Sequence, residues 1–411
     1  MAANFNIQMS AVPLPHKREC HVAVSWKNTT IILGGNVDEG NIDTMSTIYL
    51  HRGGKWMQQE TFGDFPQYDL QAYVVNDEMF VINFSRQGVA AMHSLDLLAW
   101  TWTRLSPNGT PPLEYGRSGA RSWAHQDKIY SCGSYGRFGQ VTFRLFCYNT
   151  STNSWEWPVM EGEVPSPRRH PLVTKSGNTA FLFGGWRAPQ RGIIQHFTDL
   201  HMLDLSTMRW KKVHDNLDDN VPNIREGIIY CRPYSFTSIS QSLAVVIGCA
   251  FAVNTLGWVD DCWLLNLDNA KQLMEPPFLW TKITNKFPRF FHAAVLQPLS
   301  KNLWLIGGRS LYNNPCATVL KIKFTELKSL KDLALESVAS NICDSDPRLG
   351  VDQLPRPLTY EIEAYTCETG EPYLCPRHVS GSQMVSSSTT YNLITVLLFY
   401  FIILLYYTCV C

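Results

Sequence analysis

The sequence carries no excess of charge of either sign. Its 411 residues include 35 Lys and Arg and 35 Asp and Glu, so the formal net charge at pH 7 is zero. A nucleic-acid-binding domain needs a basic surface to meet phosphates, and this balance gives no basis for such a partner. The length is sufficient for one large β domain and a tail.

Several chemical signatures are also missing. The twelve cysteines form no Cys-x-x-Cys pair and show no metal-like His/Cys spacing, so neither a metal nor a cofactor is expected. No nucleophile motif and no phosphate-binding loop appears, and the chain is predicted not to be an enzyme. His21, His170 and His292 recur at similar repeat positions, which indicates packing or loop hydrogen bonds rather than a catalytic site.

The first residues of the sequence predict no secretory leader. Met1–Phe5 has no basic segment and no apolar segment after it, which predicts a chain that stays in the reducing cytosol. Cys132, Cys147, Cys249 and Cys262 lie in strand-like runs and are expected to pack as small hydrophobes. The expected location is therefore cytoplasmic or nuclear.

A cassette of about 50 residues recurs through most of the chain. A β-branched or aromatic run precedes each clear Gly pair, at Gly34-Gly35, Gly184-Gly185 and Gly307-Gly308. Degenerate copies fall at Asn83, Gly133 and Gly248. The steps from Gly34 to Asn83, Gly133 and Gly184 are 49, 50 and 51 residues. A fixed period of this length is typical of propeller blades, which bury their apolar faces against neighbouring blades.

Tryptophans support the same phase. They follow the Gly positions at similar intervals, at Trp56, Trp102, Trp155, Trp210 and Trp280. The predicted fold is an all-β, six-bladed propeller over residues 1–325, with a short helical C-terminal region and a hydrophobic tail. The sixth cassette has no closing Trp strand, so residues 4–12, which alternate in polarity, are predicted to supply it and to close the ring.

This pattern of Gly pairs, strands and Trp residues resembles the kelch family over about residues 15–325. The segment after the last blade adds leucines at helical spacing over 327–338. It is similar to the adaptor-binding boxes of cullin-RING ubiquitin ligase receptors. The matching residues are Ala334, Leu335, Ala339 and Cys343 for the first box, and Leu354, Pro355 and Leu358 for the second. The alternative is a helix that caps the propeller.

Six blades followed by these boxes resemble the kelch-domain-containing substrate receptors of cullin-2 ligases, which recognise C-terminal degrons. The resemblance implies that residues 326–363 bind elongin B/C and cullin-2, and that the propeller binds the C-termini of substrate proteins. It implies a basic and aromatic pocket, onto which Tyr135, Trp186, Arg187 and Arg191 fall, with Trp186 standing where the family has an arginine. The alternatives are a solvated loop for these arginines and a non-ligase kelch scaffold, which could be tethered to a membrane.

The end of the sequence differs in character. Residues 364–390 are expected to form a polar linker, and residues 391–411 carry no charge. These 21 uncharged, mostly apolar residues are long enough for a transmembrane helix, so a tail anchor on an intracellular membrane, with the propeller facing the cytosol, is one prediction. The alternative is an end segment that lies outside the fold.

Overall fold

The computed structural model describes residues 5–326 apart from 38–46, 65, 67–69, 85–89, 111–119, 136–140, 188–194, 216–220, 223–233, 253–256, 276–277, 284–288, 291, 298–299 and 311–315. The chain divides into a larger unit that includes Asn6–Thr325 and a smaller one that includes Glu326–Cys411. The predicted adaptor-binding region, linker and tail lie outside the described residues, apart from Glu326. In the described part, no helix is both long and apolar enough to cross a membrane.

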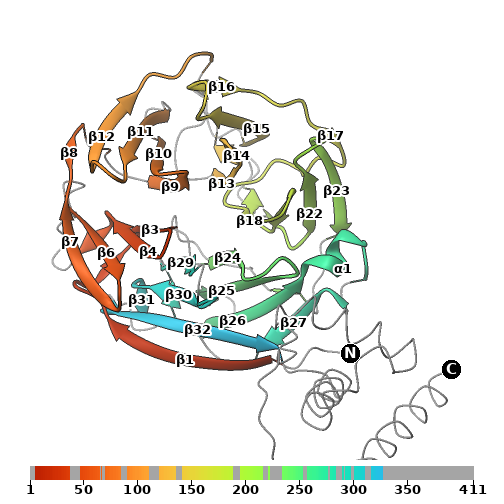
Figure 1. Ribbon diagram of the computed structural model, residues 1–411. Coiled ribbons are helices and arrows are strands. Elements are labelled where there is room, and N and C mark those ends of the chain that lie inside the picture. The colour runs from red at the N-terminus through yellow and green to blue at the C-terminus, as the bar shows by residue number, and fades with distance from the viewer. Residues whose placement is uncertain are drawn as a thin grey trace, which may run out of the picture. The chain divides into compact units, whose positions relative to one another are not determined.

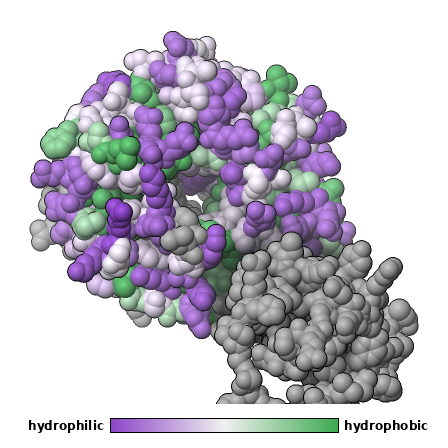
Figure 2. All heavy atoms as spheres, viewed as in Figure 1, coloured by the Kyte–Doolittle hydropathy of each residue, from purple (hydrophilic) through white to green (hydrophobic). Residues whose placement is uncertain are grey.

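The described residues of the larger unit form an all-β propeller. Six sheets of four or five strands are arranged as blades around a ring (Figure 1), which confirms the predicted architecture. Helix is scarce: the described ranges contain the five-residue helix α1 (Leu267–Lys271), capped by the side chain of Asn266. On the face seen in Figure 2, hydrophilic residues predominate around a central hollow.

Each blade runs from an inner strand to an outer strand. Blade 1 contains β3 (Val22–Trp26), β4 (Thr29–Leu33), β6 (Thr47–Arg52) and β7 (Lys55–Glu60). Blade 2 contains β9 (Leu70–Val75), β10 (Glu78–Phe84), β11 (Ala90–Asp96) and β12 (Thr101–Leu105). Blade 3 contains β13 (Arg121–His125), β14 (Lys128–Tyr135), β15 (Val141–Asn149) and β16 (Ser154–Glu156).

The second half of the ring repeats this order. Blade 4 contains β18 (Leu172–Ser176), β19 (Thr179–Phe183), β22 (Leu200–Asp204) and β23 (Arg209–His214). Blade 5 contains β24 (Tyr234–Ser238), β25 (Leu243–Ala252), β26 (Gly257–Asn266) and β27 (Trp280–Ile283). Blade 6 contains β29 (Ala293–Leu296), β30 (Leu303–Ile306), β32 (Thr318–Glu326) and β1 (Phe5–Pro13).

Short strands supplement the blades. β8 (Phe62–Gly63) and β17 (Glu161–Gly162) pair in parallel with the outer strands β12 and β23 and so cover part of their edges. Three two-stranded ribbons extend one end of blades 1, 4 and 6 beyond the Gly pairs. They are β2 (Arg18–Glu19) with β5 (Asn36–Val37), β20 (Trp186–Arg187) with β21 (Gln195–His196), and β28 (Arg289–Phe290) with β31 (Arg309–Ser310).

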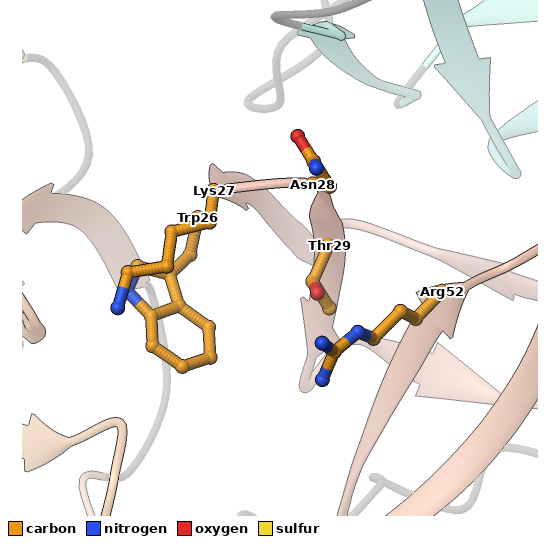
Figure 3. Close-up of a pocket in the computed structure, with 5 residues that line it drawn as sticks. All are labelled: Trp26, Lys27, Asn28, Thr29 and Arg52. Carbon is orange, nitrogen blue, oxygen red and sulfur yellow. The ribbon is translucent and has the colours of Figure 1, made fainter.

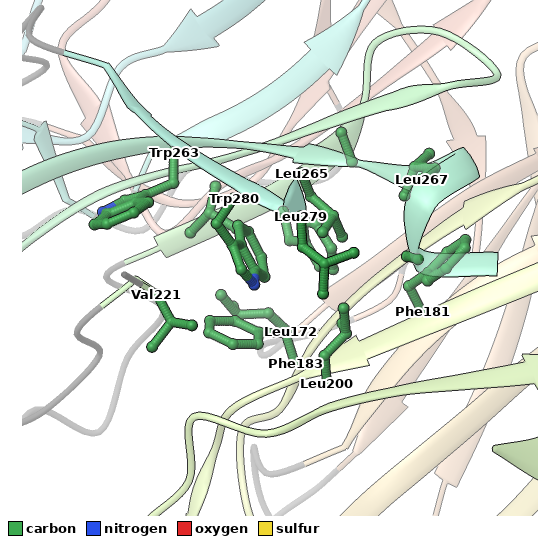
Figure 4. Close-up of a cluster of buried hydrophobic side chains, with 14 of the residues drawn as sticks. Leu172, Phe181, Phe183, Leu200, Val221, Trp263, Leu265, Leu267, Leu279 and Trp280 are labelled. Atoms are coloured by element: carbon green, nitrogen blue, oxygen red, sulfur yellow. The ribbon is translucent and has the colours of Figure 1, made fainter. Parts of the chain in front are cut away.

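The hydrophobic core lies between neighbouring blades. One cluster joins blades 4 and 5 and includes Phe183, Leu200, Leu265 and Trp280 (Figure 4). The rings of Phe183 and Trp280 have centroids 4.8 Å apart. Similar clusters join blades 1 and 2, 2 and 3, 3 and 4, and 6 and 1. Because each blade buries its faces against its neighbours, the repeats stabilise one another as a ring.

The tryptophans that recur along the sequence lie at the same place in blades 1 to 5, on the outer strand. The five tryptophans named from the sequence lie on β7, β12, β16, β23 and β27. Trp280 on blade 5 donates its indole N–H to Nε2 of His214 on blade 4 at 3.1 Å. His214 is thus tied to its neutral form, and burial lowers its pKa.

The chain start lies beside the end of the propeller. β1 forms the outer strand of blade 6 and is hydrogen-bonded to β32. Trp56 of blade 1 donates its indole N–H to the carbonyl oxygen of Pro13 at 3.0 Å. The amide of Leu14 donates to Ala317 at 2.8 Å, and its side chain is buried between blades 6 and 1.

Candidate functional site

Glycine pairs shape the end of blades 1, 4 and 6 that carries the two-stranded ribbons. Gly35 has φ +94°, and an added Cβ atom would lie 2.5 Å from the carbonyl oxygen of Glu19. Gly185 has φ +96°, and its Cβ atom would lie 2.7 Å from the carbonyl oxygen of Arg169. Only glycine suits this left-handed backbone in contact with a second chain segment.

A buried arginine accompanies each pair. It precedes the inner strand and donates from Nη1 to the carbonyl oxygen of the first glycine, as seen for Arg18 with Gly34 (3.2 Å), Arg168 with Gly184 (3.1 Å) and Arg289 with Gly307 (3.4 Å). In blade 4, Arg168 also binds both carboxylate oxygens of Asp199, at 2.5 and 2.9 Å, and both side chains are buried. In blade 6, Thr318 takes the place of this carboxylate. Each of these arginines therefore links the segment before the inner strand to the Gly pair of its own blade.

The three recurring histidines do not all occupy one position. Strand pairs Val22–Leu33, Leu172–Phe183 and Ala293–Ile306 are equivalent, so the residues just before the inner strands are His21, Pro171 and His292. His170 lies one position earlier, with φ +48°. The sequence interpretation is thus wrong for His170, because this residue corresponds to Cys20 of blade 1, which also has a left-handed backbone at φ +53°.

His21 and His292 are buried, and their role is in packing. Burial lowers the pKa of His21 to about 3, with further lowering by Arg18 and His292. Burial, with Arg289, lowers the pKa of His292 to about 4. The Nε2 atom of His292 lies 3.0 Å from the Ser235 hydroxyl. Both imidazoles are therefore neutral at physiological pH.

A basic and aromatic cluster lies beside the Gly pair of blade 4. We call Arg121, Arg169, His170, Trp186 and Arg187 the blade-4 cluster. Arg169 and Trp186 exchange backbone hydrogen bonds of 2.7 and 3.0 Å. The guanidinium of Arg169 lies 4.9 Å from the indole centroid of Trp186, and the ring of His170 is stacked on the same indole at 6.0 Å. Trp186 is thereby held by cation–π and stacking contacts.

Arg121 brings blade 3 into this cluster. It begins the inner strand β13, and its Nη2 atom lies 3.3 Å from Nδ1 of His170. Since a guanidinium can only donate, Nδ1 accepts and the proton of a neutral His170 is on Nε2. The two residues are 49 positions apart, one repeat length, so the contact joins equivalent regions of neighbouring blades.

Arg187 differs from the other two arginines of the blade-4 cluster, Arg121 and Arg169, because it is exposed. Its Nε atom donates to Oε1 of Gln195 across the β20–β21 ribbon at 2.6 Å. Its guanidinium lies 5.9 Å from the ring centroid of Phe197, which is buried. Among the described residues, the terminal nitrogens of Arg187 have no hydrogen-bond partner, so its planar fork faces solvent.

The structure describes the side chains of two of the four predicted pocket residues, Trp186 and Arg187. Trp186 and Arg187 form β20 together, whereas Tyr135 ends β14, and the description covers its backbone pairing with Val141. Arg191 and all seven predicted adaptor-binding residues lie outside the described residues. Sequence reasoning missed Arg121 and Arg169, and it assigned His170 to packing or loop hydrogen bonds rather than to this site. The run Arg168-Arg169-His170 before an inner strand was the available signal.

Reactive groups are scarce in the described part. Burial raises the pKa of the Cys132 and Cys147 thiols to about 12, so they stay protonated. Within the described ranges, no group of three or more His, Cys, Asp or Glu residues could hold a metal ion. The blade-4 cluster is instead suited to binding an anionic group through arginine and an apolar group on Trp186.

Known proteins resemble this chain in part. The kelch motif matches residues 116–160. Acyl-CoA-binding domain-containing protein 4 of Arabidopsis thaliana is 29% identical over 171 residues, which are 39% of this chain and 25% of that protein. Kelch domain-containing protein 2 of Bos taurus is 26% identical over 237 residues, covering 48% of this chain and 57% of that protein.

A solved structure shares the fold. The chain in "Structure of YjhT" superposes with a TM-score of 0.52 at 14% identity, covering 76% of this chain and 99% of that one. The present chain spans between a quarter and about half of the length of the two curated relatives. The chain thus combines a kelch motif at residues 116–160 with six described propeller blades, a fold that generally serves as a protein-interaction scaffold.

Proposed function

We propose that this kelch propeller is the substrate-binding subunit of a cullin-2 RING ubiquitin ligase. It recognises the C-terminal carboxylate of a substrate at the blade-4 cluster. Residues 326–363 bind elongin B/C and cullin-2. The observation that carries the substrate part is the exposed fork of Arg187, which follows Trp186 along β20 and is held by Gln195. The ligase part rests on the resemblance of Leu335 and its neighbours to adaptor-binding boxes.

The chemistry of the blade-4 cluster favours a carboxylate. A guanidinium matches a carboxylate through two parallel N–H···O bonds, and Arg187 has its terminal nitrogens available for this. Gln195 and Phe197 hold the rest of its side chain, which reduces the ordering cost on binding. Trp186 offers an apolar surface for the residues that precede the terminal carboxylate. Tyr135 and Arg191 complete the site in this proposal.

Replacing Arg187 should weaken carboxylate binding. For Arg187→Ala we expect a 10- to 100-fold loss of affinity, about 1.4–2.8 kcal/mol, for a fluorescent pool of random octapeptides that end in a free Gly carboxylate. The control is Arg209→Ala, which removes an exposed arginine from the outer strand of the same blade. Fluorescence anisotropy measures both. Equal affinities of the Arg187→Ala and native proteins would contradict the assignment.

Replacing Leu335 should break the ligase contact. An amphipathic helix inserts its leucine in an apolar groove, so Leu335→Asp would bury an unpaired charge there, at a cost of about 3–5 kcal/mol. Pull-down of elongin B/C by the full chain should therefore be lost. Lys331→Asp, a charge change at a polar position nearby, is the control. If elongin is absent even with the native chain, the non-ligase scaffold becomes the better account.

A further inference from the structure

A second candidate site lies at the opposite end of blade 1. β4 runs from Thr29 towards the Gly34-Gly35 pair, so the β3–β4 turn is at the far end from the two-stranded ribbons. A pocket of about 310 Å³ opens there, lined by Trp26, Lys27, Asn28, Thr29 and Arg52 (Figure 3). In this view the indole of Trp26 and the guanidinium of Arg52 stand on opposite sides of the pocket, with Thr29 beside Arg52.

Two tight turns build the pocket. The turn between β3 and β4 has Lys27 in the left-handed region, at φ +50°. The turn between β6 and β7 consists of Gly53 and Gly54, with φ +58° and +80°, and an added Cβ atom would meet nothing within 4 Å at either. Paired glycines form a two-residue hairpin turn without help from side chains. Arg52 is thus not needed to hold its own turn.

Arg52 is the last residue of the third strand of blade 1, and most other blades carry a different type of residue at this position. The last residue of the third strand is Asp96, Asn149, Asp204 or Asn266 in blades 2 to 5, and Arg52 in blade 1. Each Asp or Asn accepts hydrogen bonds from backbone amides of the segment that follows, at 2.7 to 3.3 Å. The repeat therefore favours a capping Asp or Asn here, and the fold itself gives no reason for an arginine.

The charges in the pocket leave Arg52 unbalanced. Lys27 forms an ion pair with Asp77 at 2.8 Å, and the indole N–H of Trp26 donates to the same carboxylate at 2.9 Å. Lys27 also lies 4.8 Å from the indole centroid. By contrast, Arg52 is exposed and has no ion pair or hydrogen bond within the described part of the chain. The charge of Arg52 is therefore not neutralised, and across the pocket lies the indole of Trp26, which Asp77 and Lys27 hold in place.

We propose that this pocket binds an acidic side chain of a partner polypeptide. Arg52 takes the carboxylate of a Glu or Asp residue through two N–H···O bonds, assisted by the Thr29 hydroxyl. An apolar neighbour of that residue packs on Trp26. A single unbalanced cation suits a monoanionic carboxylate better than a phosphate dianion. The site goes beyond the proposed function, because it gives the propeller a second partner surface at the other end of the blades from Arg187.

The test uses the full chain and a peptide that cannot engage the blade-4 cluster through a terminus. The N-acetylated, C-amidated peptide Gly-Phe-Glu-Phe-Gly carries its one charge on the Glu side chain. We expect it to bind by calorimetry, and we expect the matched Gln peptide to bind at least 10-fold more weakly. Arg52→Ala should weaken the Glu peptide at least 10-fold, and Arg52→Lys should weaken it less.

Two matched variants separate this site from other effects. Lys55→Ala removes the cation at the other side of the same Gly-Gly turn and should change the affinity by less than 2-fold. Arg187→Ala should leave it unchanged, which distinguishes failure here from failure of the proposed function. Equal binding of the Glu peptide to Arg52→Ala and native protein, or no binding to native protein at millimolar concentration, would overturn the proposal. Displacement by inorganic phosphate more readily than by acetate would overturn the choice of ligand.

Discussion

Deleting residues 1–13 should lower the free energy of unfolding by about 3–6 kcal/mol. The deletion removes β1 and leaves the backbone groups of β32 without their hydrogen-bonded neighbour. It also removes the Pro13 carbonyl that accepts from Trp56. The loss is partial rather than total, because Gln297 of blade 6 still reaches Thr30 of blade 1 through a buried hydrogen bond. Urea unfolding of the native and shortened chains measures the difference.

A synthetic peptide of residues 1–13 provides the control for this deletion. An open sheet edge can accept a strand in trans, so the peptide should restore most of the lost stability in a concentration-dependent way. Met9→Lys within β1 should be nearly neutral, because Met9 is exposed. An unchanged unfolding midpoint after deletion would show that β1 does not close the ring.

Acidification should destabilise the propeller strongly. Burial lowers the pKa of His21 to about 3 and the pKa values of His201 and His292 to about 4, from an ordinary 6.5. Between about pH 6.5 and pH 4, these histidines therefore bind protons in the unfolded chain but stay neutral in the folded chain. The stabilisation is complete above about pH 7.5 and is lost as pH falls through 6.5 towards the folded values. At pH 5 the loss is about 2 kcal/mol per histidine, or about 6 kcal/mol for three.

Urea unfolding at pH 7.5 and pH 5.0 measures this loss. His292→Asn removes one of the three groups, so it should reduce the stability difference between the two pH values by about one third, whatever it does to stability at pH 7.5. His16→Asn is the control, since His16 is exposed. A pH dependence that is identical in native and His292→Asn proteins would show that these buried imidazoles do not control acid stability.

The sequence predicted the features that repeat. Gly pairs and tryptophans recur with a period that matches one blade, and each has a local physical requirement, left-handed backbone for Gly35 and an outer-strand packing position for Trp210. The strands themselves also followed from pattern, because middle strands such as β4 are buried throughout and consist of β-branched and apolar residues.

The details that depend on contacts between segments were not predictable in the same way. The bond of Arg168 to Gly184 and Asp199 joins three segments whose spacing differs between blades. Strand register, which the sequence does not reveal, makes Pro171 and not His170 the counterpart of His21. The contact between Arg121 and His170 could have been found, because equivalent loops one period apart lie on adjacent blades.

The most direct test of the central claim compares two forms of one ligand. Random octapeptides ending in Gly are prepared as a pool with a free terminal carboxylate and as a pool with a terminal amide, and each is titrated into the native chain. Recognition through Arg187 predicts that the free-carboxylate pool binds at least 10-fold more tightly, because the amide presents no second oxygen and no charge to the guanidinium. Equal binding of the two pools, or no binding of either, would contradict carboxylate recognition by this propeller.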